Sequence, residues 1–320
     1  MAQAKVLARD SVQRNSPSGS TSNNSTLGIV FMSLGIFCYA CSNAFVKETA
    51  PNYPIGEILF FRSLFFFIPL SLYLLLSKGI KGTKATLKTV HMRVYVIRGF
   101  LSAISLFFIF LAFKLLPFAE ASALSFSGTF FVTLLSIPLL KEHVGWHRWG
   151  ALFIGFAGIL LIVQPTNGVL ALVGVGAAAA LLGAFIDAIV MIYGRILSRS
   201  DSNTTIVFYY ALYSLIASTF ALSLGWVTPS QEDLLRLIGV SAGSGIGQVF
   251  ITHAFRNAEA SSLSPMIYTL MLWGVLFGYL FWGEVPTSDV LTGSAIIIAS
   301  GLYIFQRESR ARKKSLAAAV

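Results

Sequence analysis

The chain has 320 residues, of which 56% are hydrophobic and only 11% are charged. A soluble domain carries about a quarter charged residues, so this composition cannot cover a water-facing surface and indicates a chain that lies in lipid. The formal net charge is +10, which in a soluble protein would suggest nucleic-acid binding. Here the charges fall in short stretches between apolar runs, so we expect them to orient the chain in a membrane, with no nucleic-acid partner.

The N-terminal segment differs from the rest. Residues 1–26 are polar and rich in Ser and Asn, and such a segment cannot bury a core, so it is predicted to be a disordered tail. The first apolar run, from Leu27 to Val46, is longer than a typical signal-peptide core. Cys38 and Cys41 lie one helical turn apart within that run and are interpreted as small apolar helix residues, not as a disulfide or a metal pair.

Ten apolar runs are long enough to cross a hydrocarbon core of roughly 30 Å as helices. They fall near 27–47, 54–78, 94–116, 118–140, 147–164, 170–196, 204–225, 233–255, 262–283 and 287–306. The runs do not alternate between polar and apolar residues as the strands of a membrane β-barrel do, and the connections between them are short. The sequence therefore predicts an all-α integral membrane protein with ten transmembrane helices.

Lysine and arginine predict how these helices are oriented. Most of them fall in segments that lie on the same side as the N-terminus, while Lys47, Lys114 and Arg236 fall on the opposite side. Short basic loops stay in the cytoplasm. Both termini, including the basic tail 307–320, are therefore predicted to be cytoplasmic.

One short segment occurs twice in the chain. Ala119-Glu-Ala-Ser-Ala-Leu-Ser matches Ala258-Glu-Ala-Ser-Ser-Leu-Ser at six of seven positions, and Glu142 and Glu284 follow the two copies. Five helices per copy is an odd number, so the copies would face opposite ways in the bilayer. The pattern predicts two inverted five-helix repeats, 27–165 and 170–306, a plan that recurs in transporters.

Further motifs accompany this repeat: Ser42-Asn-Ala-Phe-Val-Lys47, Glu57-Ile-Leu-Phe-Phe-Arg62 and Arg98-Gly99. Together they resemble the EamA-type family of the drug/metabolite transporter superfamily. The resemblance implies ten helices, a central cavity and transport of small metabolites across the cytoplasmic membrane. The stretch from Phe208 to Arg307 looks most like bacterial S-adenosylmethionine uptake transporters, a pattern that riboflavin and amino-acid carriers share in large part. One departure is Phe126, where the second half has Pro265 and the family commonly has proline in both halves.

Two charges lie well inside predicted helices. Such a charge costs roughly 2.5–3.5 kcal/mol on insertion scales, so a retained one suggests function. Arg62 and Asp187 are the clearest cases, and aligning the two repeats places Tyr39 opposite Asp187, so that both would face the central cavity. A guanidinium for a carboxylate and a carboxylate for an amine or sulfonium suit a zwitterion. The structural alternative pairs Arg62 with Glu57 and Asp187 with Arg98, without substrate.

Weaker candidates complete the predicted site. Tyr39 and Asn43 share one helical face, where polar side chains can bind a ligand or join helices. Arg98 lies nearer the interface and could snorkel; aromatic residues could stack on a flat or cationic ligand or simply pack. The predicted substrate-binding residues are Arg62, Asp187, Tyr39, Asn43, Arg98, Gln248, Tyr193, Tyr268 and Trp273.

These patterns predict a secondary transporter for a small polar or zwitterionic metabolite. S-adenosylmethionine uptake is the first choice, and import or export of amino acids, riboflavin or related metabolites is the alternative; a channel or a membrane-embedded receptor is the outside class. No enzyme signature is present, and no metal or cofactor is expected, because His143 and His147 lack a third ligand nearby. Proton coupling through Asp187 or Glu57, exchange and passive uniport fit equally, and the sequence leaves the oligomeric state open.

Overall fold

The computed structural model describes residues 25–140, 146–163, 170–198, 200–258, 263 and 266–317. Within these ranges the backbone is helical apart from short connections, and no strand occurs. Part of what the sequence predicts lies outside the described residues: the tail from residue 1 to 24, Glu142, Glu259, His143 and Pro265.

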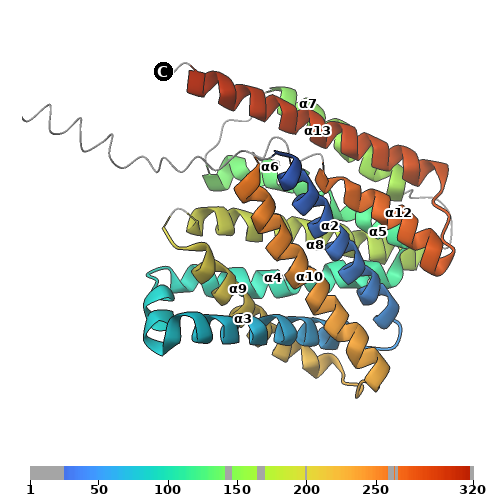
Figure 1. The fold of residues 1–320 in the computed structure, drawn as a ribbon. Coiled ribbons are helices and arrows are strands. Elements are labelled where there is room, and N and C mark those ends of the chain that lie inside the picture. Colours follow the sequence, from blue (N-terminus) through green and yellow to red (C-terminus); the bar gives the residue numbers. More distant parts are fainter. Residues whose placement is uncertain are drawn as a thin grey trace, which may run out of the picture.

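The helices follow one another with short connections (Figure 1). They are α2 (Ser25–Thr49), α3 (Ile55–Thr86), α4 (Met92–Leu115), α5 (Phe118–Ser125), α6 (Gly128–Leu140), α7 (Trp146–Val163), α8 (Leu170–Leu197), α9 (Asn203–Ala221), η1 (Leu222–Leu224), α10 (Gln231–Asn257), α12 (Thr269–Trp282) and α13 (Ser288–Ala317). Each of the ten predicted spans has a helix, α5 and α6 forming one span with a break after Ser125. Seven spans are long and apolar enough to cross a membrane, and three further apolar helices are shorter. The prediction of an all-α membrane protein is confirmed.

Local chemistry sets several helix ends. Ser202 and Ser230 cap α9 and α10, each accepting a hydrogen bond from a backbone amide in the first turn. Gly79 has a φ of 63°, a conformation that suits glycine, and it interrupts α3. The chain turns back there, and Thr83 donates a hydrogen bond of 3.0 Å to the carbonyl of Leu74. The long straight part of α3 therefore ends where the sequence predicts, near residue 78.

The main helix contacts join the first half of the chain (residues 25–163) to the second half (residues 170–317). Helix α2 packs on α10, α4 on α8, α7 on α13 and α3 on α9. Figure 1 shows α2 and α10 running side by side across the bundle, and α7 with α13 along one edge. The two halves are therefore interleaved and do not form separate bundles.

Small residues let α2 and α10 approach closely. A side chain at Gly243 would place its Cβ 2.8 Å from the carbonyl oxygen of Cys38 and 3.1 Å from the Cβ of Ser42. Ser42 itself donates a hydrogen bond of 2.6 Å to the carbonyl of Val240. Close packing and interhelical hydrogen bonds are what hold helices together in lipid, so this interface couples the two halves.

An ion pair and a hydrogen bond also join the halves at the end of the bundle that the sequence predicts to lie outside the cell. Lys47 forms an ion pair with Glu284 and donates a hydrogen bond of 3.0 Å to the carbonyl of Leu116. Tyr53 donates a hydrogen bond of 2.8 Å to Asp233.

Asp201 joins the halves at the other end. It accepts hydrogen bonds of 2.6 Å from Thr89 and 2.8 Å from Tyr95. Burial alone would raise the pKa of the Asp201 carboxyl, but these hydrogen bonds outweigh it and hold the pKa below its ordinary value. Asp201 is therefore charged at neutral pH, where it is the stronger acceptor.

We predict that Gly243→Val destabilises the protein. Overpacking typically costs about 1–3 kcal/mol, and here the added methyl groups meet backbone atoms that cannot move aside. The midpoint of thermal unfolding in detergent, followed by circular dichroism, should fall. Gly150→Val is the matched control, because a Cβ at Gly150 meets nothing within 4 Å; equal midpoints for the two variants would contradict the prediction.

Candidate functional site

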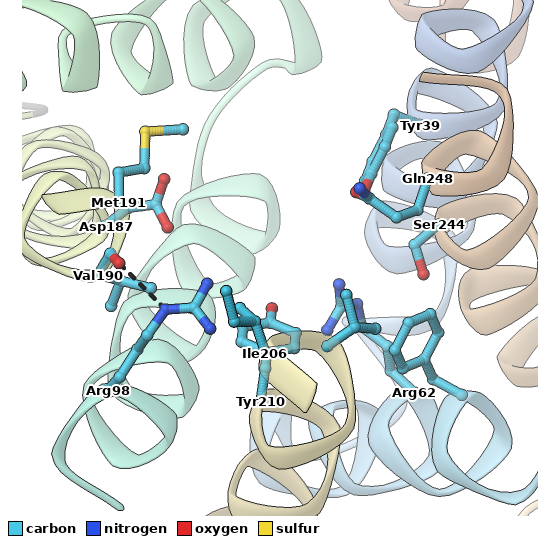
Figure 2. Close-up of a pocket in the computed structure, with 12 residues that line it drawn as sticks. Tyr39, Arg62, Arg98, Asp187, Val190, Met191, Ile206, Tyr210, Ser244 and Gln248 are labelled. Atoms are coloured by element: carbon cyan, nitrogen blue, oxygen red, sulfur yellow. Dashed lines mark hydrogen bonds between the residues drawn. The ribbon is translucent and has the colours of Figure 1, made fainter. Parts of the chain in front are cut away.

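Six helices surround a cavity of about 270 Å³ inside the bundle. Helices α2, α3 and α10 form one wall and α4, α8 and α9 form the other (Figure 2). Its lining consists of Tyr39, Arg62, Phe66, Arg98, Asp187, Val190, Met191, Ile206, Val207, Tyr210, Ser244 and Gln248. Two arginines and one aspartate, Arg62, Arg98 and Asp187, therefore line one cavity inside an apolar bundle.

The guanidinium group of Arg98 is held in place, but one of its nitrogens has no hydrogen-bond partner. Its Nε donates a hydrogen bond of 3.2 Å to the carbonyl of Val190, and its guanidinium lies 5.1 Å from the ring centre of Tyr210. Its Nη1 is buried without a hydrogen-bond partner. Gly194 leaves room for this group, since a Cβ there would lie 3.2 Å from Nη2. A fixed guanidinium with an unpaired donor is well suited to receive an anionic oxygen.

Asp187 lies on the same wall as Arg98, and Figure 2 shows both side chains pointing into the cavity. Arg98 and Arg62 are the cations that act on its carboxylate. No salt bridge within 4.0 Å joins Asp187 to either of them among the described residues. The two guanidinium groups therefore act on the carboxylate from a distance, and its oxygens are not held in an ion pair.

Arg62 lies across the cavity from Arg98, with Tyr210 between them (Figure 2). Within the described part of the chain, Arg62 forms no ion pair with Glu57, whose carboxylate instead accepts a hydrogen bond of 2.9 Å from the amide of Val227. The structural alternative of an Arg62–Glu57 pair is wrong in this conformation.

The remaining polar groups lie on the α2 and α10 side. Tyr39 donates a hydrogen bond of 2.9 Å to the side-chain oxygen of Gln248, and Ser244 lies one turn before Gln248 on α10. Together with Tyr210 these groups can donate and accept hydrogen bonds around a polar ligand. Among the described residues, no group of three His, Cys, Asp or Glu side chains could hold a metal ion.

The cavity collects five of the nine residues predicted from the sequence: Tyr39, Arg62, Arg98, Asp187 and Gln248. The other four do not line it. Tyr268 stacks on Phe126 at 5.5 Å, and Trp273 packs edge-on against Phe37 at 4.8 Å. Asn43 and Tyr193 are half-buried on α2 and α8 but lie away from this lining. Whether any of the nine binds substrate stays a prediction.

Sequence reasoning missed Tyr210 and Ser244. The repeat carried a signal for the first: the separation that aligns Tyr39 with Asp187 also aligns Arg62 with Tyr210. No comparable signal pointed to Ser244, since small polar residues are common along α10.

A family model matches nearly the whole membrane portion of the chain, over residues 26–164 and 174–306, and describes the EamA-like transporter family. The chain belongs to the EamA-like transporter family. It is therefore a multi-pass membrane protein of a transporter family, and the resemblance found in its motifs is confirmed.

Curated relatives cover most of the chain. The pseudopaline exporter CntI of Pseudomonas aeruginosa is 32% identical over 279 residues, covering 85% of this chain and 94% of that protein. The S-adenosylmethionine uptake transporter of Rickettsia conorii is 26% identical over 292 residues, covering 90% of this chain and 95% of the relative. A crystal structure with 16% identity has a TM-score of 0.61 and covers 89% of this chain and 98% of its own, which supports the fold.

We predict that the cavity of this EamA-like chain is reached by water. After Cys38 and Cys41 are replaced by alanine, Tyr210→Cys should react with a small water-soluble thiol reagent, because its side chain faces the cavity. Ser218→Cys is the matched control on the same helix, since Ser218 is 0% exposed and does not line the cavity. Labelling at equal rates, followed by mass spectrometry, would contradict a hydrated cavity.

Proposed function

We propose that this protein is an alternating-access carrier for a small zwitterionic metabolite whose carboxylates outnumber its cationic groups. The observation that carries the proposal is the charge of the cavity. Arg62 and Arg98 supply two guanidinium groups and Asp187 supplies one carboxylate, so a complementary ligand offers two anionic groups and one cationic group. A net-anionic amino acid has that pattern.

The size of the cavity favours a small ligand. Pockets for drug-sized ligands have volumes of about 300–1,000 Å³, and this cavity of about 270 Å³ lies just below that range. Amino-acid-sized metabolites therefore fit this cavity better than larger ones.

S-adenosylmethionine is the second candidate, and uptake of this compound is the activity that several relatives are named for. Its sulfonium could lie between Asp187 and the rings of Tyr39 and Tyr210, all of which line the cavity. The compound carries one carboxylate against two positive groups, however, so it would leave one arginine without an anionic partner. The charge balance therefore places it second.

The helix pairing supports the inverted repeat on which alternating access depends. If α2, α3 and α4 correspond to α8, α9 and α10, the exchange of halves turns the α2–α10 pair into the α8–α4 pair and returns α3–α9 to itself; all of these pairs occur. The hydrogen bonds at the ends fit the same relation. Tyr53 precedes α3 and Asp201 precedes α9 by two residues, and each forms a tyrosine–aspartate bond with the other half.

Glu57 supports proton coupling as a further part of the proposal. The side chain is fully buried, one carboxylate oxygen has no hydrogen-bond partner, and no cation within 4.0 Å pairs with it in the described residues. A carboxyl group in such surroundings favours its neutral form. Opening of the bundle at the end that contains Glu57, which is predicted to lie outside the cell, would hydrate the carboxyl group and favour release of its proton.

Transport by purified protein in liposomes tests the proposal. We expect counterflow of labelled glutamate to exceed that of S-adenosylmethionine and riboflavin. Arg62→Gln and Arg98→Gln should each reduce glutamate counterflow about tenfold or more, since a hydrogen bond to a charged group contributes about 1.5–3 kcal/mol. Asp187→Asn should reduce counterflow of glutamate but leave counterflow of a dicarboxylate without an amine unchanged.

Arg236→Gln provides the control, because Arg236 is partly exposed, pairs with Glu232 and Asp233 on its own helix and does not line the cavity. Counterflow of S-adenosylmethionine but not of glutamate would contradict the charge argument. Equal flux in protein-free liposomes would contradict carrier-mediated transport. An imposed pH gradient that leaves the flux unchanged would remove proton coupling.

Inverted topology and cytoplasmic termini predict that the C-terminal ends of α2 and α8 face opposite sides of the membrane. Glu48 lies in the last turn of α2 and Ser198 directly follows α8, and both are exposed. In intact bacterial cells a membrane-impermeant thiol reagent should label Glu48→Cys but not Ser198→Cys, and in inside-out vesicles the pattern should reverse. Labelling of both from one side would exclude the inverted repeat.

A further inference from the structure

A second and larger hollow lies between α3 and α10. It has a volume of about 740 Å³, and its walls are mainly apolar, with Pro69, Leu70, Ile246 and Val249 among them. Along α10 it extends from Ser241 to Arg256, which at 1.5 Å per residue is roughly 22 Å of helix. We call this hollow the α3–α10 groove.

The groove opens to the lipid side of the bundle. Ile246 is 51% exposed and Val249 is 56% exposed on α10, and Tyr73 is 67% exposed on α3. In a membrane, apolar side chains at this depth contact hydrocarbon and not water. An elongated apolar groove of this length matches an acyl chain.

One end of the groove is basic. Arg256 and His253 line it at the last turns of α10, and no carboxylate is among the residues of the lining. Arg256 is exposed and forms no salt bridge with the described residues. The proposed orientation places this end at the cytoplasmic surface, where anionic headgroups lie and where a basic residue attracts them by about 1 kcal/mol.

The interface that corresponds to it by the repeat, between α4 and α9, is closed. Where α4 meets α9, Gly99 lets Tyr213 pack directly against the α4 backbone, and the rings of Tyr95 and Tyr209 lie 4.8 Å apart. In the α3–α10 groove, Gly245 has only the ring of Phe66 nearby, at 3.5 Å from an added Cβ. The groove is therefore specific to α3 and α10, because the corresponding pair of helices, α4 and α9, packs without one.

From these observations we propose that the α3–α10 groove binds one anionic phospholipid, with an acyl chain along α10 and the phosphate at Arg256. Phe66, Val207 and Gln248 line both the groove and the polar cavity. The bound chain therefore covers the side of the polar cavity and separates its charged groups from the bilayer. The binding site stands independently of the identity of the transported metabolite.

Native mass spectrometry of the delipidated full chain tests the proposal, with phosphatidylglycerol and phosphatidylcholine of the same acyl chains as probes. Wild type should bind one phosphatidylglycerol about fivefold more tightly than phosphatidylcholine, as about 1 kcal/mol implies. Arg256→Gln should remove that preference while keeping chain binding. Gly245→Phe should weaken both lipids, because the new ring fills the groove without a backbone clash.

Two controls separate the groove from the rest of the lipid-facing surface. Lys81→Gln removes another exposed basic residue on the proposed cytoplasmic side, and Gly150→Phe adds a ring where nothing lies within 4 Å. Both should leave lipid binding unchanged. Equal effects of Arg256→Gln and Lys81→Gln, or of Gly245→Phe and Gly150→Phe, would overturn the proposal. Loss of a dimer mass in Gly245→Phe would also overturn it, by assigning the groove to a second copy of this chain.

Discussion

The burial of unlike charges inside a membrane-spanning bundle is the constraint on which this structure depends. Each of Arg62, Arg98 and Asp187 would be costly in lipid, at roughly 2.5–3.5 kcal/mol apiece on insertion scales. The fold reduces that cost by gathering the three around one cavity, where Arg98 bonds a backbone carbonyl and acts on Asp187. The three side chains leave one positive charge in excess and one guanidinium nitrogen without a hydrogen-bond partner, which is the imbalance that the proposed anionic ligand would neutralise.

Close contact between the halves makes this arrangement possible. The cavity walls come from α2, α3 and α10 on one side and α4, α8 and α9 on the other, so each wall contains helices of both halves. Small residues such as Gly243 and Gly247 bring α10 against α2, which fixes Gln248 beside Tyr39. A relative movement of the walls would change the distance between Arg62 and Arg98, and with it the affinity for a ligand that joins them.

Hydropathy alone predicted the helices, because a span must be long and apolar whatever its neighbours are. The charged residues of the cavity could also be predicted, because a charged side chain is costly in lipid and its presence there suggests a function. Aromatic residues carried no such information: Tyr268 and Trp273 pack against Phe126 and Phe37, as most aromatic side chains in this chain do. Tyr210 would have required the repeat to be aligned helix by helix, because position in a bundle depends on tertiary packing that periodicity does not encode.

The α3–α10 interface differs from its counterpart, the α4–α9 interface, and that difference has a physical consequence. A perfectly symmetric bundle would close both interfaces with tyrosines, as α4 and α9 do, and would leave the polar cavity sealed by protein alone. Replacing that packing by a groove exposes Phe66 and Gln248 to the lipid side. A polar cavity beside hydrocarbon needs an apolar cover that can move with the helices, and a flexible acyl chain meets that need without fixing α3 to α10.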